Sequence, residues 1–309
     1  MTKAIVERKN KRWYTKFAPI VCILLCATMV MKSSVMKDGA IQGMDIAFKT
    51  VVPTLFPFFI LSDLWSCYFQ IDEGAFALKI FEGILKIPSC AISAFLAGNV
   101  CGFPLGVKMA NDLYCNRKIS KDQATLLCGI SNNPSAAFVI SGVGQGLFHS
   151  SRIGVLLYFC CIITSLLCSV IYKQKYENDA KPQNNSEQTF NLVSSIKAAG
   201  LNSITISSFI IFFSALISLL KSIIRNPLII ATFSSFFEVS NATTLITNIT
   251  YLPIKIKTAL VAFSLGFSGF SVHFQAFSLM SNELSKTKYL SIKFTQGLLC
   301  GLLSFLLIK

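Results

Sequence analysis

The chain has 309 residues, of which 53% are hydrophobic and 14% are charged, and its mean hydropathy is +0.62. A soluble domain carries roughly 25% charged residues, and a soluble fold of this length cannot cover so much apolar surface with polar side chains. The composition therefore excludes a soluble globular protein, a disordered chain and a secreted disulfide scaffold. It predicts an all-α polytopic membrane protein whose main partner is the lipid bilayer.

The net charge of +14 is spread along the chain rather than gathered in one patch. Basic residues stand at the ends of apolar runs, as flanking charges do in membrane proteins, so no nucleic-acid partner is predicted. They are densest in the segment 1–16, where only Glu7 opposes them. By the positive-inside rule this basic N-terminus is expected to lie in the cytoplasm. A cleavable signal peptide is the weaker alternative, because no clear small-x-small site follows the apolar run 17–31.

Two largely apolar halves, 17–172 and 192–309, flank the polar segment 173–191, which is expected to be a flexible linker. A membrane-spanning helix needs about 20 apolar residues. The runs expected to cross the membrane, the shorter ones with the help of amphipathic flanks, are 17–31, 153–172, 198–220, 258–280 and 294–308. The apolar run 51–67 contains Pro53 and Pro57, so any helix there is expected to be kinked.

The two halves share a weak internal repeat. A shift of 135 residues places the segment 119–138 on 254–273 and the break 131–135 on 266–270. Each half then has a spanning helix, two interrupted segments and a second spanning helix, which predicts inverted repeats with re-entrant hairpins. Matching interruptions are the best sequence pointer to a transport site. The reason is that a broken helix frees backbone polar groups that only protein or a water-filled cavity can cover.

In the first half, the run 98–106 holds three glycines and one proline. Ser120 and Gln123 then have the spacing of a capping box, so a helix is expected to start there and to end near residue 130. The segment 119–148 is predicted to form a re-entrant hairpin, and an extramembrane turn between two short helices is the alternative. The candidate substrate-binding residues of this half are Asn99, Gly102, Gly106, Lys108, Asn132, Asn133 and Ser135.

In the second half, Glu238 is the one charged residue between Arg225 and Lys255. A carboxylate within the bilayer costs roughly 2.5–3.5 kcal/mol on insertion scales, so Glu238 is expected to face the protein interior and to serve transport. A helix end in the membrane interface is the alternative position. Glu238, His273 and Asp63 are candidates for proton or ion coupling. The candidate substrate-binding residues of this half are Glu238, Ser240, Asn241, Ser268, Ser271 and Gln275.

The eleven cysteines and two histidines do not follow a metal-binding pattern, because no Cys-x-x-Cys pair occurs. The cysteines are expected to be small buried hydrophobes, and no metal, cofactor or disulfide is predicted. Residues 266–269 match the Gly-x-Ser-Gly pattern of rhomboid intramembrane proteases. His273 follows Ser268 too closely to act as its base from another helix, so no catalytic residue and no enzymatic activity are predicted.

The motifs of residues 98–148 resemble those of the YlbJ-like sporulation integral membrane proteins. These belong to the nucleoside-recognition (Gate) domain group, which is related to concentrative nucleoside transporters. The resemblance rests on the pattern G-x-P-x-G-x-K at Gly102, Pro104, Gly106 and Lys108, followed by ISKDQA and NNPS. It implies a transporter of dipicolinic acid in the outer forespore membrane of a sporulating bacterium. Lys108, the asparagine amides, Gln275 and freed backbone N–H groups would bind this small aromatic dianion.

Two other functions stay open. A carboxylate at Glu238 beside an amide at Asn241 suits ribose hydroxyls, so a transporter or sensor of a nucleoside-like solute is the first alternative. A non-transporting sporulation membrane assembly protein is the second. The sequence leaves both H⁺ and Na⁺ open as the coupling ion, and it allows a homo-oligomer.

Overall fold

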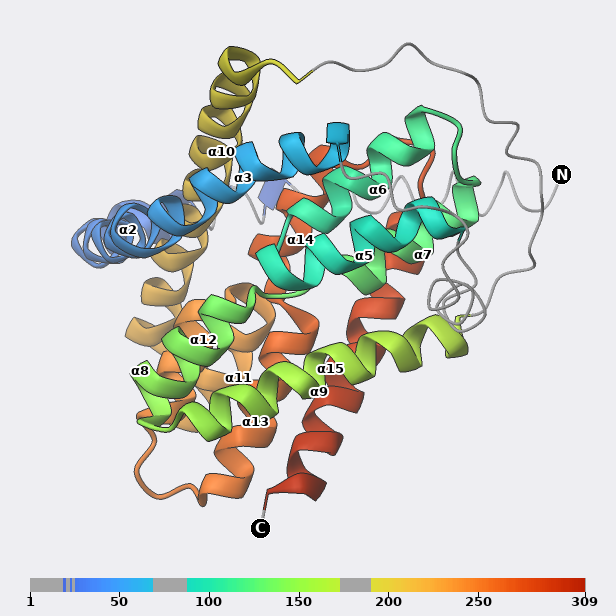
Figure 1. The fold of residues 1–309 in the computed structure, drawn as a ribbon. Helices are drawn as coiled ribbons and strands as arrows, with labels where there is room; N and C mark the ends of the chain where they lie inside the picture. The colour runs from blue at the N-terminus through green and yellow to red at the C-terminus, as the bar shows by residue number, and fades with distance from the viewer. Residues whose placement is uncertain (1–18, 21–22, 24–25, 69–87, 173–189, 309) are drawn as a thin grey trace, which may run out of the picture.

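The computed structural model describes residues 19–20, 23, 26–68, 88–172 and 190–308 (Figure 1). Within these residues all regular elements are helices, which confirms the predicted all-α class. They are α2 (Ser33–Ile46), η1 (Ala47–Val51), α3 (Val52–Tyr68), α5 (Ser89–Cys101), α6 (Leu105–Cys115), α7 (Lys121–Ser131), η2 (Phe138–Gln145), α8 (Gly146–Phe148), α9 (Ser151–Ile171), α10 (Leu192–Ile223), α11 (Pro227–Phe237), α12 (Val239–Thr247), α13 (Ile254–Phe267), α14 (Gly269–Leu279) and α15 (Lys286–Leu307). The basic N-terminus 1–16 and residues 173–189 of the linker lie outside the described residues.

Four helical stretches of the described chain are long and apolar enough to cross a membrane: α9, α10, α13 with α14, and α15. Their outer faces expose large apolar side chains, among them Phe159 (55% exposed), Leu201 (68%) and Leu306 (67%). Exposed apolar surface on this scale is unfavourable in water and suits contact with lipid tails. Length, composition and exposure together confirm a polytopic membrane protein.

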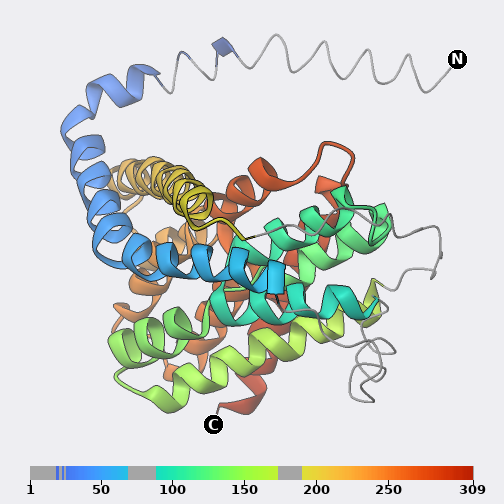
Figure 2. The ribbon, with the colours of Figure 1, turned by 45° about the horizontal axis from the view of Figure 1, so that its top comes forward.

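Helix α2 lies along α10, as Figure 2 shows. Glycines of α2 allow the close approach, because a Cβ atom at Gly43 would stand 2.7 Å from the Ile211 Cα atom, and one at Gly39 would stand 2.9 Å from the Ala215 Cα atom. Small residues at such contacts are typical of helix pairs in membranes. This contact fixes α10, from which Ile206 and Ile210 reach the cavity described below.

The run 51–67 forms helix α3, which continues through Pro57. The chain leaves regular α-helical geometry just before α3, in the π-helical segment η1. Such turns often occur at functional sites. Val51 at the end of η1 and Leu55 in α3 both line the cavity.

The repeat predicted from the sequence has a counterpart in the order of the helices. Adding 135 to the bounds of α9 (Ser151–Ile171) gives 286–306, and α15 occupies Lys286–Leu307. The same shift takes α6 to 240–250, close to α12, and takes α7 to 256–266, which lies inside α13. The inverted relation of the halves stays a prediction.

Consecutive helices that pack on each other include α5 with α6, α6 with α7, and α11 with α12. This corrects the hairpin predicted at 119–148, because α7 packs on α5, α6 and α15, whereas η2 packs mainly on α9. Backbone geometry gives the reason. Gly102 has φ +92° and lets the chain turn sharply between α5 and α6, whereas none of the residues 132–135 that follow α7 has a positive φ.

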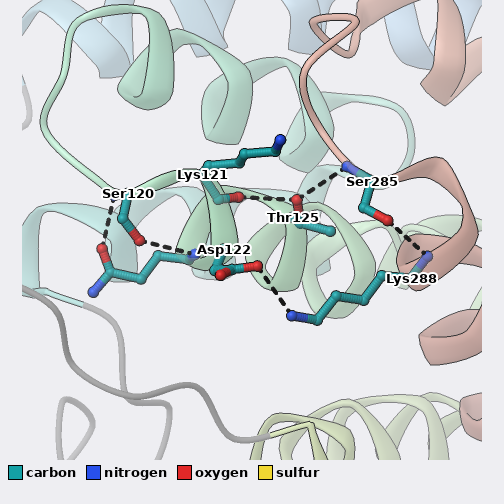
Figure 3. Close-up of polar contacts among 7 residues, drawn as sticks. Ser120, Lys121, Asp122, Thr125, Ser285 and Lys288 are labelled. Carbon is teal, nitrogen blue, oxygen red and sulfur yellow. Dashed lines mark hydrogen bonds and ion pairs between the residues drawn. The ribbon is translucent and has the colours of Figure 1, made fainter. Parts of the chain in front are cut away.

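The capping box predicted at the start of α7 is confirmed (Figure 3). The Gln123 N–H donates to Ser120 Oγ at 3.3 Å, and the Ser120 N–H donates to Gln123 Oε1 at 2.9 Å. Beside it, Lys288 at the start of α15 donates to Asp122 at 3.2 Å. The contact between Lys288 and Asp122 joins the beginning of α7 in the first half to the beginning of α15 in the second.

Candidate functional site

Within each half of the chain, two helix breaks pack against each other in the protein interior. Gly102 lies against the break after α7, because a Cβ atom there would stand 2.7 Å from the backbone nitrogen of Ser135. Gly269, at the start of α14, lies against the break after α11, because a Cβ atom there would stand 3.2 Å from the backbone nitrogen of Glu238. This close contact brings backbone polar groups freed by the breaks into a small region of the protein.

A cavity of about 260 Å³ lies among these breaks. Both halves contribute to its wall, together with η1, α3 and α10. Apolar side chains such as Phe103, Phe138 and Ile206 form most of the surface, and a few polar groups interrupt it, as is usual for small-molecule sites. The predicted binding residues that line the cavity are Gly102, Ser135, Glu238, Ser240, Ser271 and Gln275.

Glu238 is 2% exposed and caps the N-terminus of α12. Its carboxylate accepts hydrogen bonds from the Ser240 N–H at 2.9 Å, the Asn241 N–H at 2.7 Å and the Asn241 side-chain amide at 2.9 Å. The positive end of the α12 dipole and these donors offset the negative charge. Although Glu238 lines the cavity, its carboxylate oxygens are therefore engaged by the protein.

Two other helix N-termini contribute residues to the cavity wall. Helix α14 starts after Ser268, which makes no side-chain capping bond, and Ser271 of its first turn lines the cavity. Ser135 stands just before the helical segment that leads into η2. Its hydroxyl accepts a hydrogen bond from the Phe138 N–H at 3.2 Å. The first N–H groups of a helix lack partners within the helix and favour anions. Two helix N-termini, which favour anions, and the Glu238 carboxylate therefore lie at the same cavity wall, and none of the described residues that line it is cationic.

Gln275 adds an unused acceptor to the cavity wall. It is 2% exposed, and its Oε1 atom is buried without a hydrogen-bond partner among the described residues. Its amide nitrogen donates to Ser271 Oγ at 3.4 Å. Buried polar groups are normally paired, so Gln275 is suited to contact a bound solute.

A second polar cluster, made of Asn99, Asn132, Asn133, Lys293 and Gln296, lies beside the break after α7. Asn133 is its centre: its amide nitrogen donates to Asn99 Oδ1 at 2.9 Å, and its Oδ1 accepts from Gln296 at 2.6 Å and from Lys293 at 3.2 Å. All five residues are at most 4% exposed. The cluster joins α5, the α7 break and α15, and none of its members lines the cavity.

His273 belongs to the edge of this cluster rather than to the cavity. Its Nδ1 atom lies 3.1 Å from the Tyr289 hydroxyl, which also accepts from the Asn132 amide at 2.6 Å. The His273 Nε2 atom and the Asn132 Oδ1 atom are buried without a hydrogen-bond partner among the described residues. The predicted coupling residue is thus connected to the predicted binding residue Asn132 through Tyr289.

The remaining candidates lie apart from the cavity. Lys108 forms an ion pair with Asp63, so the predicted cation and the predicted coupling carboxylate engage each other. Gly106 packs on Ser131 so closely that a Cβ atom would overlap it. The Asn241 amide donates to Ser214 Oγ at 2.9 Å, and the Ser268 hydroxyl donates to Leu265 O at 3.1 Å.

Sequence reasoning missed Lys293, Tyr289 and Gln296. Lys293 stands directly before the apolar run 294–308, a position that is typical of a charge flanking a membrane span. Helix α15 starts earlier, at Lys286, which places Lys293 two turns inside it. The spacing of Lys293 and Gln296, three residues apart on one face of a helix, was the signal available. Among the described residues, no three His, Cys, Asp or Glu side chains gather as a metal-binding group.

Comparison with known proteins gives one informative similarity. Over 93% of its length the chain is similar to the sporulation integral membrane protein YlbJ of Bacillus subtilis (strain 168), with 23% identity across 331 aligned residues that cover 81% of that protein. No family model matches the chain, and no solved structure matches it. The similarity and the apolar helices together support an integral membrane protein of sporulation.

Proposed function

We propose that this protein is a membrane transporter of a small organic anion, and that dipicolinic acid, moved across the outer forespore membrane, is the substrate that fits best. The observation that carries the proposal is the cavity at which broken helices of both halves meet. Secondary transporters bind anionic groups at the N-termini of discontinuous helices in this way. The similarity to a sporulation membrane protein supports the setting.

The size and lining of the cavity favour a one-ring solute. Its volume of about 260 Å³ lies below the 300–1,000 Å³ of pockets that hold drug-sized ligands. Phe103 and Phe138 offer ring contacts. The Ser135 and Ser271 hydroxyls and the N-terminus of α14 offer donors to carboxylates. We assign the positive potential to helix N-termini and not to Lys108, because Lys108 is paired with Asp63.

A transporter or sensor of an uncharged, nucleoside-like solute is the second candidate. The observation that favours it is the unpaired Oε1 atom of Gln275, an acceptor that suits a hydroxyl or a ring N–H. The two candidates differ in charge, so a charge placed in the cavity separates them.

The test is uptake of radiolabelled dipicolinic acid into proteoliposomes that contain the purified protein, with uridine in parallel. The variant Gln275→Glu puts a carboxylate in the cavity wall at nearly constant shape. We expect it to lower dipicolinate uptake at least about tenfold, because like charges repel strongly at low dielectric constant. The matched control is Gln145→Glu, at an exposed position outside the cavity lining.

Each outcome assigns a function. Dipicolinate uptake that Gln275→Glu abolishes and Gln145→Glu preserves supports the anion transporter. Uridine uptake that neither variant changes would favour the second candidate. No uptake of either solute by folded protein would overturn both and leave a membrane assembly role.

A further inference from the structure

Lys293 is fully buried in a membrane-spanning helix, two turns from its start. Its exposed fraction is 0%, and it lies seven residues from the start of α15, in the part of that helix that packs on α7 and α9. A buried ammonium is costly unless other groups replace its hydration. The groups that contact Lys293 therefore show why the fold retains it.

Three neutral oxygen atoms surround the Lys293 nitrogen. Nζ donates to the backbone carbonyl of Asn132 at 2.7 Å, to Gln296 Oε1 at 2.8 Å and to Asn133 Oδ1 at 3.2 Å. An ammonium has three N–H donors, so the three acceptors match the charged form. Among the described residues, no carboxylate forms an ion pair with Lys293.

The position of these oxygens is that of a cation site. Asn132 follows the last residue of α7, where the helix dipole is negative and the carbonyl groups lack partners within the helix. Broken transporter helices use such carbonyls, together with neutral side-chain oxygens, to bind Na⁺. At this break the fold supplies the same kind of oxygen ligands, and the Lys293 ammonium lies among them in the place of a bound ion.

We propose that Lys293 is a tethered cation that occupies a monovalent-cation site at the break between α7 and η2. Its ammonium holds the Asn132 carbonyl and the Asn133 side chain, and Ser135 of the same break lines the cavity. The protein therefore needs no Na⁺ to form its binding site. This consequence for transport rests on the proposed function, whereas the cation site itself does not.

The test is cation rescue of stability in purified protein. The variant Lys293→Ala removes the ammonium and leaves the oxygens, so we expect a lower thermal unfolding midpoint in choline chloride than for the unmodified protein. Methylammonium or Na⁺ at equal ionic strength should then raise the midpoint by roughly 5 °C when the cation is at about 100 times its Kd. The control is Lys288→Ala on the same helix, whose lysine pairs with Asp122 near the helix start (Figure 3). Its midpoint should not distinguish these cations from choline.

Lys293→Ser, purified throughout in methylammonium, gives the same comparison if Lys293→Ala does not fold. A loss of stability that neither cation restores beyond choline overturns the proposal and leaves Lys293 with a packing role. Replacement of Na⁺ by choline in the uptake assay adds a second readout. Uptake by the unmodified protein that changes less than about twofold supports the consequence that the binding site forms without Na⁺, and uptake that requires Na⁺ overturns that consequence. Cation rescue without any uptake would keep the site and reject the proposed transport.

Discussion

The contact between Gly102 and Ser135 joins two helix breaks at the cavity, and the substitution Gly102→Ala tests it. Gly102 has φ +92° and ψ 179°, a region that essentially only glycine adopts, and alanine there costs of order 1–3 kcal/mol. The added Cβ atom would also stand 2.7 Å from the Ser135 nitrogen and 2.8 Å from the Ser135 Cβ atom. Overpacking of this kind costs about 1–3 kcal/mol.

Together these effects predict a loss of about 2–6 kcal/mol. We expect a fall in the thermal unfolding midpoint of at least roughly 4 °C, with reduced dipicolinate uptake because Ser135 must move. The matched control is Gly200→Ala in α10, where an added Cβ atom would have no neighbour within 4 Å. Alanine inside a helix is favoured over glycine by about 0.5–1 kcal/mol, so the control should be neutral or stabilising.

The measurement is the unfolding midpoint of the two variants and the unmodified protein in one detergent. A Gly102→Ala midpoint equal to that of the unmodified protein would show that the two breaks are not in close contact. A Gly200→Ala midpoint as low as that of Gly102→Ala would show that the loss is unrelated to the helix break.

Two further substitutions separate structural from transport roles. Asn133→Leu removes a side chain that makes five hydrogen bonds. Lys293, Gln296 and Asn99 each lose one hydrogen bond in the buried cluster, and a buried polar group left unsatisfied costs about 1–3 kcal/mol. The unfolding midpoint should therefore fall, and an unchanged midpoint would contradict the described network. Glu238→Gln keeps one oxygen for the α12 cap and should cost about 0.5–2 kcal/mol with uptake per folded molecule preserved. Abolished uptake at unchanged stability would instead assign the carboxylate to ion coupling.

Local signals in the sequence predicted much of the helical framework. The apolar runs that start near residues 153 and 198 correspond to α9 and α10, and Ser120 begins α7 with the expected capping box. These features depend on neighbouring residues, since hydrophobic length and capping act within one helix. The run 258–280 was predicted as a span with an interruption at 266–270, and the structure has a spanning stretch there that is divided at Ser268, where φ is +78°. A break of this kind depends on what packs against it, here Glu238 beside Gly269.

The composition of the candidate site could be predicted only in part. Glycines and small polar residues at the interruptions pointed to the cavity, because broken helices need such residues. The partner of each charged side chain could not be predicted in the same way. Lys108 pairs with Asp63, 45 residues away, and Lys293 meets Asn132 across 161 residues.

An all-α membrane protein with interrupted helices could be predicted from the sequence, because hydrophobic length and helix-breaking residues are local properties. The folded structure was needed to show which interruptions line a cavity, which carboxylate caps a helix and which lysine lies among three oxygens. Those assignments depend on contacts between α7 and α15 and between α11 and α14, and the packing of distant helices fixes them.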